Sequence, residues 1–250
     1  MSNIKQYIGS LENLTLNTAL GYIDSDTAIK IDKFSRVNAP NGDIVLFSSF
    51  NNDNPFLDTP AELFLNSTSA SDTFEVEIQY LYQNRDIQTV TKTLTGTTNV
   101  SLGTNVYCVF RMFNNNGIDQ VGTINIKNGG GSIFCQMALL TNNFPSNQSL
   151  TGIFSVPRGY IALITNASIT ADKGMDLKGV ALTRQLGGVF RFTKALSSFQ
   201  AQSSFYDLFL IADEKTDFKP IAYAQIGGIA YLDYQILLLK KDSIGKNFKI

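Results

Sequence analysis

The chain has 250 residues, a formal net charge of -1 and only 16% charged side chains. This length is enough for one large β domain or two small ones, each with a buried core. A near-neutral chain without a basic stripe lacks the electrostatic footprint of a nucleic-acid-binding protein, so we expect no nucleic-acid partner. The absence of histidine excludes Ser-His-Asp triads and histidine metal ligands.

The longest apolar runs, such as Ile236–Leu239, are far shorter than the roughly 20 residues that span a bilayer, so we expect no membrane segment. The first residues, Met-Ser-Asn-Ile-Lys-Gln, lack the apolar core of a signal peptide, which predicts synthesis in a cytoplasm. Cys108 and Cys135 lie in apolar, strand-like runs and are predicted to be buried free thiols rather than a disulfide. We expect no cofactor and no metal site.

Residues 1–22 are predicted to form an N-terminal arm. Leu11, Leu14, Leu16 and Leu20 are apolar among polar neighbours, but they follow neither a helical nor a strand period. Four leucines are more than a solvated tail requires. We therefore expect the arm to pack against a neighbouring subunit, with disorder of the free arm as the alternative.

Residues 23–140 are predicted to form a β-sandwich domain. Residues 74–82 alternate apolar and polar side chains with period 2, which predicts a strand with one buried and one solvated face. Further strands are expected at 89–94, 106–112, 121–127 and 133–140, and residues 95–100 resemble the loop of a hairpin. Short strands separated by Gly- and Asn-rich turns favour a sandwich or a jelly roll.

Residues 141–150 are polar, contain Pro145 and lack periodicity, so they are predicted to be a linker. A second β-sandwich domain is expected over 151–250, with strands at 153–164, 177–183, 189–192, 205–210 and 231–239. Pro157–Gly159 interrupts the first of these strands, and Gly227–Gly228 is expected to form a bulge or tight turn. The predicted fold is therefore all-β, with two sandwich or jelly-roll-like domains in tandem behind the arm.

Asp213, Glu214 and Asp217 are the nearest approach to the paired carboxylates of a glycosidase. Nothing in the sequence places them in a pocket, and Lys215 and Lys219 lie beside them, so we favour a charged turn at the end of a sheet. Without histidine, acid–base chemistry would depend on such carboxylates. We therefore predict no catalytic residues and no enzymatic activity.

Three arginines stand out in the second half, where charged residues are few. One of them, Arg191, lies between Phe190 and Phe192 and, in a strand, projects to the face opposite both. Arginine beside aromatic side chains is enriched at interfaces, whereas a solvent-exposed strand arginine is the alternative. Together with leucines of the arm, the candidate interface residues are Leu11, Leu14, Leu16, Arg158, Arg184 and Arg191.

Several segments occur in a characteristic order. The second half contains Phe-Ser-Val-Pro-Arg-Gly-Tyr-Ile-Ala-Leu from Phe154, Gly-Gly-Val-Phe-Arg-Phe from Gly187 and Asp-Glu-Lys-Thr-Asp-Phe from Asp213. The first half contains Ser67–Thr73, Gln88–Val100 and Val106–Met112. In this order, over roughly residues 60 to 240, they resemble a family of β-rich structural proteins of tailed, often marine, bacteriophages, of the head-decoration or head-fibre kind.

The resemblance implies a non-catalytic virion protein made in the cytoplasm of a bacterial host. It implies an auxiliary capsid protein, a decoration, cement or head-fibre component, that binds the major capsid protein or other virion proteins. In the family, the Glu-Lys-Thr-Asp segment joins two strands and is not an active site. We also predict a homo-oligomer, a trimer, because sheet edges and aromatic surface favour symmetric association.

The alternative is a tail or baseplate adaptor or a receptor-contact module of the virion. A carbohydrate-binding module needs an aromatic platform with amides nearby. Tyr80 and Tyr82, with Gln83 and Asn84, are the candidates for such a platform, and an ordinary half-buried strand explains them equally well.

Overall fold

The computed structural model describes residues 27–172, 174–199 and 204–243, and the structural statements below concern these residues. The predicted arm and its leucines Leu11, Leu14 and Leu16 lie outside them. The described residues form antiparallel strands without an α-helix, together with two short 3-10 turns at Thr141–Asn143 and Lys241–Ser243. The all-β prediction is therefore confirmed.

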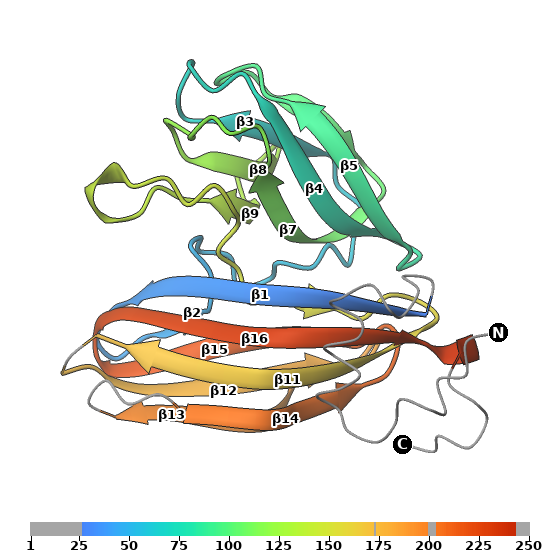
Figure 1. Cartoon of the computed structure of the whole chain (residues 1–250), viewed down its shortest axis with the longest axis vertical. Coiled ribbons are helices and arrows are strands. Elements are labelled where there is room, and N and C mark those ends of the chain that lie inside the picture. Colours follow the sequence, from blue (N-terminus) through green and yellow to red (C-terminus); the bar gives the residue numbers. More distant parts are fainter. Residues whose placement is uncertain (1–26, 173, 200–203, 244–250) are drawn as a thin grey trace.

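The lower half of the molecule in Figure 1 is a pair of facing sheets, here called the base sandwich. One sheet has the strand order β1 (Ala28–Ala39), β16 (Gly228–Lys240), β11 (Tyr160–Ala171) and β14 (Ser204–Ala212). The central strands of the other sheet are β15 (Asp217–Ile226), β12 (Asp176–Arg184) and β13 (Arg191–Phe199). Two short strands, β2 (Ile44–Leu46) and β10 (Phe154–Ser155), both pair with the outer side of β15.

Within the base sandwich the chain changes sheet at β1–β2, β10–β11, β11–β12, β13–β14, β14–β15 and β15–β16. This alternation, with the two strand orders, is that of a jelly roll.

A second unit, here called the inserted unit, lies between β2 and β10 in the chain and above the base sandwich in Figure 1. One of its sheets has the order β6-β3-β8-β9 and the other the order β5-β4-β7. Its strands are β3 (Leu63–Ser67), β4 (Glu75–Tyr82), β5 (Ile87–Thr93), β6 (Val100–Gly103), β7 (Val106–Asn114), β8 (Ile124–Asn128) and β9 (Ile133–Met137). The inserted unit has a hydrophobic core of its own.

The predicted tandem order of the two domains is wrong. Strands β1 and β2 fall within the predicted first domain, 23–140, yet β1 pairs with β16 along its whole length and β2 pairs with β15. Residues 141–150 are not a free linker, because the amide of Ser149 donates to Met112 and the amide of Asn114 donates to Asn147. Periodicity tells which face of a strand is buried but not which distant strand it pairs with.

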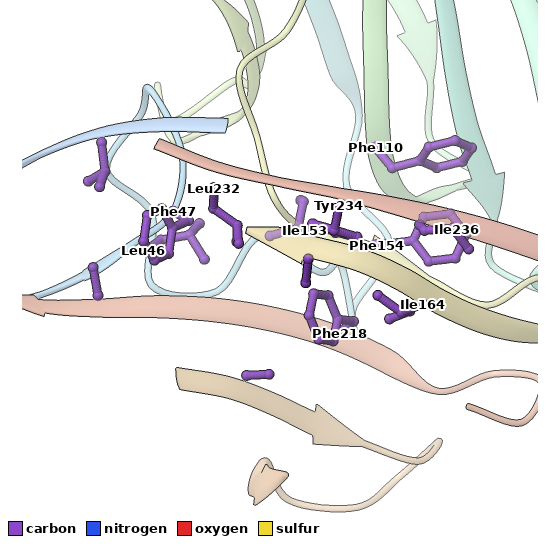
Figure 2. Packing of buried hydrophobic residues seen from close by; sticks show 14 of the residues in the cluster. Leu46, Phe47, Phe110, Ile153, Phe154, Ile164, Phe218, Leu232, Tyr234 and Ile236 are labelled. Atoms are coloured by element: carbon purple, nitrogen blue, oxygen red, sulfur yellow. The ribbon is translucent and has the colours of Figure 1, made fainter. Parts of the chain in front are cut away.

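The core of the base sandwich extends into the inserted unit. Figure 2 shows Leu232, Tyr234 and Ile236 of β16 between the sheets, with Phe218 of β15 opposite them. Phe154 of β10 packs edge-on against Phe110 of β7, with ring centroids 5.3 Å apart. Since Phe110 belongs to the inserted unit, the two units share buried apolar surface rather than only a covalent connection.

The prediction of a hairpin with its loop at 95–100 is also wrong. The turn is present, but β5 pairs with β4 and β6 pairs with β3, so the turn carries the chain from one sheet to the other. Gly96 has a φ of +66°, and a Cβ atom there would lie 2.8 Å from the carbonyl oxygen of Ala70. The turn therefore requires glycine both for its backbone conformation and for close packing.

The sequence pattern did not reveal strand β15, because Pro220 lies in its middle. The carbonyl oxygen of Pro220 accepts a hydrogen bond from the amide of Phe47, on the side of β15 away from β12. In an antiparallel strand the N–H and C=O of one residue point to the same neighbour. The missing N–H of Pro220 therefore falls on that outer side, between the short strands β10 and β2, and the ladder with β12 is kept.

Candidate functional site at the junction of the two units

A polar cluster with a buried centre and a half-exposed rim lies where the inserted unit meets the base sandwich. From the inserted unit it includes the segment before β3, the β4–β5 turn and β7. From the base sandwich it includes β10, the end of β12 and the first residue of β15. The members of this junction cluster are Asp58, Arg85, Tyr107, Ser155, Arg184 and Asp217.

The fully buried carboxylate of Asp217 is the centre of the cluster. Its Oδ1 accepts hydrogen bonds from Arg85 Nη1 at 2.7 Å and from Ser155 Oγ at 2.7 Å. Its Oδ2 accepts from the Tyr107 hydroxyl at 2.6 Å and from Arg184 Nε at 2.7 Å. A buried carboxylate without partners costs several kcal/mol, by order of magnitude, and donors of this number and charge offset that cost.

Arg85 reaches into the cluster from the β4–β5 turn. Its side chain is buried, and its guanidinium carbon lies 3.2 Å from the centroid of the Tyr107 ring. Its backbone φ is +70°, a conformation that residues other than glycine rarely adopt. The amide of Arg85 donates to Tyr82 at 2.8 Å, and its carbonyl accepts from the amide of Arg158 at 3.0 Å. The first hydrogen bond closes the turn, and the second holds the turn against the base sandwich.

Arg184, at the end of β12, connects the two acidic residues of the cluster. Its Nη1 and Nη2 donate to the two carboxylate oxygens of Asp58, at 2.9 and 2.7 Å, while its Nε donates to Asp217. Burial alone would lower the pKa of Arg184, but the hydrogen bonds to Asp58 and Asp217 raise it above its ordinary value. Arg184 therefore stays charged wherever the protein is folded.

The pKa of Tyr107 is also raised, first by burial and then by Asp217. Tyr107 therefore stays protonated and remains a donor to Asp217. Tyr107 and Arg85 of the inserted unit therefore donate to the same carboxylate as Arg184 of the base sandwich, and the cluster connects the two units.

Lys33 of β1 is a second buried cation at the junction. Its Nζ donates to the carbonyl oxygen of Phe110 in the inserted unit. Burial lowers the pKa of Lys33 to about 8, against a smaller opposing influence of Cys135 and Cys108. Both cysteines are free and buried, as predicted. Burial raises the pKa of the Cys135 thiol to about 11, so this thiol is protonated at neutral pH.

Two of the segments that carry the phage-protein resemblance meet beside the junction cluster. The amide of Val156 donates to Thr216 and the amide of Lys215 donates to Val156, both at 2.9 Å. The amide of Gly159 donates to Glu214 Oε2 at 2.7 Å. The Asp213–Thr216 segment joins β14 to β15, as expected, and it docks on the turn that contains Pro157.

Two carboxylates of this turn pair with one lysine. Asp213 and Glu214 both pair with Lys241 Nζ, at 2.6 and 2.9 Å. The hydrogen bond from Lys241 lowers the pKa of Asp213, and the backbone amide of Gly159, followed by Lys241, lowers the pKa of Glu214. Asp217 lies buried between two arginines instead. The charged-turn prediction is correct for Asp213 and Glu214 and wrong for Asp217.

The three candidate interface arginines differ in their surroundings. Arg184 is directed inward, and Arg158 forms an exposed ion pair with Asp86 at 2.9 Å, next to Arg85. Arg191 is exposed at the start of β13, where it pairs with Thr183, the residue before Arg184. A role of these arginines in contacts with another protein remains a prediction.

The side chains proposed as a carbohydrate platform do not form an open face. Tyr80 is 3% exposed and meets Tyr82 edge-on, with an interplanar angle of 74°. The Gln83 side-chain amide is engaged by two backbone carbonyl oxygens, those of Leu57 and Val106. These residues are better explained as part of the inserted unit's own packing.

Sequence reasoning missed Lys33, Asp58, Arg85 and Tyr107 as junction residues. Arg85 lies in the polar run Asn-Arg-Asp of a turn, which is typical of an exposed position. Its burial depends on contacts with β10 and β15, which are far away in the chain. No local signal could have identified it.

No group of three His, Cys, Asp or Glu side chains suited to a metal ion occurs in the part of the chain that the structure describes. Within the same ranges, no helix has the length and apolar character needed to cross a membrane.

Comparison with known proteins gives no family assignment. No family model matches the chain, and no curated protein matches it. A structure of infectious bursal disease virus, Gx strain, matches at 9% identity and a TM-score of 0.27, covering 89% of this chain and 73% of that chain. The VP2 subviral particle of the same virus matches at 8% identity and a TM-score of 0.26, covering 86% and 72%. TM-scores this low do not show a shared fold.

Proposed function

We propose that the chain is a non-catalytic structural protein of a phage virion, an auxiliary protein that binds the major capsid lattice as a decoration, cement or head-fibre component. The sequence resemblance indicates the kind of particle. The geometry of the chain supports a role in binding by surface complementarity.

The observation that carries the proposal is a braced scaffold with large apolar side chains exposed at separate places. Leu186, Val189 and Phe192 are exposed on the base sandwich, at the β12–β13 turn and the start of β13. A second set, Ile118, Val121 and Phe144, is exposed on loops of the inserted unit. Contiguous exposed apolar patches on a monomer mark contact surfaces, and we propose that each set forms one.

The junction makes these surfaces useful for cementing a lattice. A clamp strengthens a lattice only if its two contact surfaces keep a fixed separation, since a flexible connection lowers the effective concentration of the second contact. The buried cluster around Asp217 and the shared apolar core hold the inserted unit on the base sandwich. Many weak contacts multiplied by the symmetry of a shell then give strong overall binding.

The polar groups of the site support a structural role rather than a catalytic one. The buried carboxylate is saturated with donors, and the carboxylates of the neighbouring turn are paired with Lys241. A general acid needs a proton near neutral pH, whereas the pKa values of Asp213 and Glu214 are lowered.

The test is the copy number of the chain in purified virions, measured by quantitative mass spectrometry against the major capsid protein. We expect a copy number in the hundreds, in a constant ratio to the capsid protein. A dozen copies or fewer would contradict the capsid assignment and favour the tail or baseplate alternative. Absence from the particle would reject a virion role.

A further inference from the structure

We propose that the free edge of the base sandwich, residues 185–195 of the β12–β13 turn and β13, binds an extended acidic strand of another virion protein by strand addition. The inference rests on the proposed function and names the surface and the chemistry of the partner.

The two sides of the base sandwich differ in how they are covered. On one side, Lys33 of β1 donates to the carbonyl of Phe110 in β7, and β2 and β10 line the outer side of β15. The inserted unit lies over that side (Figure 1). Strands β13 and β14 lie on the opposite side, away from the inserted unit.

Strand β13 is the last strand of its sheet and pairs only with β12 in the described parts of the chain. The outer N–H and C=O groups of its first residues therefore face no other described strand. An unpaired edge is a template for a further strand, and peptides add to such edges through main-chain hydrogen bonds. The geometry favours an extended segment over a helix or a small molecule.

The side chains of this edge are apolar to an unusual degree for an exposed position. Leu186 is 61% exposed, Val189 71% and Phe192 79%. By contrast, the ring of Phe190 turns inward, where the guanidinium of Arg184 lies 4.7 Å from its centroid. The edge thus presents solvent-exposed apolar side chains beside backbone groups that form no hydrogen bonds to another described strand.

The charge of the edge decides which kind of strand fits. Residues 185–195 contain Arg191 and Lys194 and no acidic residue. Both cations are exposed, and neither takes part in an ion pair within the described residues. Opposite charges on neighbouring strands stabilise a sheet and like charges destabilise it. The complementary segment carries Asp or Glu between apolar residues.

The same charges argue against a second copy of this chain as the occupant. Pairing of β13 with β13 of another copy would bring cations together on the joined sheet. The edge strands of the inserted unit, β5, β6, β7 and β9, contain no Asp or Glu that would satisfy them. We therefore take a different protein as the partner, and pairing with β14 of a second copy, which contains Asp207, is an outcome of the test below.

The test uses the full chain and a capped, fluorescein-labelled ten-residue peptide of alternating Val and Glu, followed by fluorescence polarisation. The control peptide alternates Val and Lys. We expect the Val-Glu peptide to bind and the Val-Lys peptide not to bind. Two charge reversals, Arg191→Glu with Lys194→Glu, should weaken binding about tenfold or more, because each replaces an attraction to the peptide's glutamates by a repulsion.

Phe192→Ser tests the apolar part of the edge and should also weaken binding. The matched control is Ile226→Ser, because Ile226 is an exposed apolar residue of the same sheet but lies on β15. Circular dichroism and thermal unfolding show whether each variant keeps the fold. No binding of the Val-Glu peptide at millimolar concentration, or equal binding of the Val-Lys peptide, would overturn the inference.

Sedimentation equilibrium of the wild-type chain and of Phe192→Ser tests the second-copy alternative. Self-association that Phe192→Ser abolishes would overturn the inference in favour of a homo-oligomeric edge. These assays use the isolated chain. A negative result would therefore reject the binding edge without deciding the proposed function, which the copy number in virions tests separately. A chain that is absent from virions but binds the acidic peptide would instead reject the proposed function alone.

Discussion

Asp217 illustrates how one residue can join two parts of a fold. Its carboxylate accepts hydrogen bonds from Arg85 and Tyr107 of the inserted unit and from Ser155 and Arg184 of the base sandwich. Removing one partner of a buried ion pair leaves a charge without compensation, which costs more than the pair itself contributes. The stability of the junction therefore depends on the complete set of partners.

Arg85→Met and Asp217→Asn should each lower the free energy of unfolding by about 3 kcal/mol or more, because each leaves buried polar groups unpaired. The double variant should lose less than the sum of the two, because the residues interact directly. Urea unfolding curves measure all three losses.

The matched control for this pair is Arg158→Met. Arg158 pairs with Asp86 at the surface, so we expect a loss of about 1 kcal/mol or less. If Arg85→Met destabilised the protein no more than Arg158→Met, the junction cluster would not brace the two units.

Lys33 gives the junction a dependence on pH. Burial lowers its pKa in the folded protein to about 8. The unfolded chain therefore binds more protons between about pH 8 and the ordinary lysine pKa near 10.5, and stability due to this group rises with pH across that window. Below that window Lys33 is charged in both states, and its burial cost is felt in full.

Lys33→Met should remove this rise, whose total is on the order of 3 kcal/mol for a shift of this size. The measurement is the free energy of unfolding at several pH values from 7 to 11, compared between variant and wild type. Lys30→Met, which changes a partly exposed lysine of the same strand, should keep the rise. A difference between wild type and Lys33→Met that does not change with pH would contradict the buried-amine interpretation.

At the scale of elements, local pattern predicted most strands. The period-2 alternation over 74–82 corresponds to β4, and the apolar run that ends at Leu239 lies within β16. Strand β15 was missed because proline within a strand is read as a break, and the missing N–H of Pro220 falls on the outer side of the strand, between β10 and β2, which only the folded sheet shows. The turn at 95–100 was recognised, but its strands belong to different sheets.

Two glycines with nearly the same φ angle allow the cost of backbone strain to be measured separately from the cost of close packing. Gly96 and Gly117 have φ values of +66° and +68°, but a Cβ atom at Gly117 would meet nothing within 4 Å, whereas one at Gly96 would meet the backbone of Ala70. Gly117→Ala should cost about 1 kcal/mol, from backbone strain alone. Gly96→Ala should cost about 1–3 kcal/mol more, because the neighbouring backbone must move.

Thermal and urea unfolding of the two alanine variants measure both costs. Equal losses would mean that the turn at Gly96 tolerates a methyl group, and the close approach to Ala70 would then not fix how the chain crosses between the sheets.

At the scale of the whole molecule, the order of elements along the chain differs from their arrangement in space. The insertion of one β unit between β2 and β10 could not be predicted, because the pairing of β1 with β16 joins the two ends of the described chain. The candidate site shares this property: Arg184 and Asp217 were visible as charged residues, but Asp58 and Arg85 reach them only in the folded structure. One side of the base sandwich is thereby covered by the inserted unit, and the β13 side is left open.

We propose that this braced pair of β units acts as a structural component on the capsid of a virion. Cryo-electron microscopy of intact virions tests it most directly. We predict density on the capsid lattice into which the base sandwich and the inserted unit fit together as one rigid body, at high copy number. Density confined to the tail, or a fit that requires the two units to be moved apart, would contradict the account.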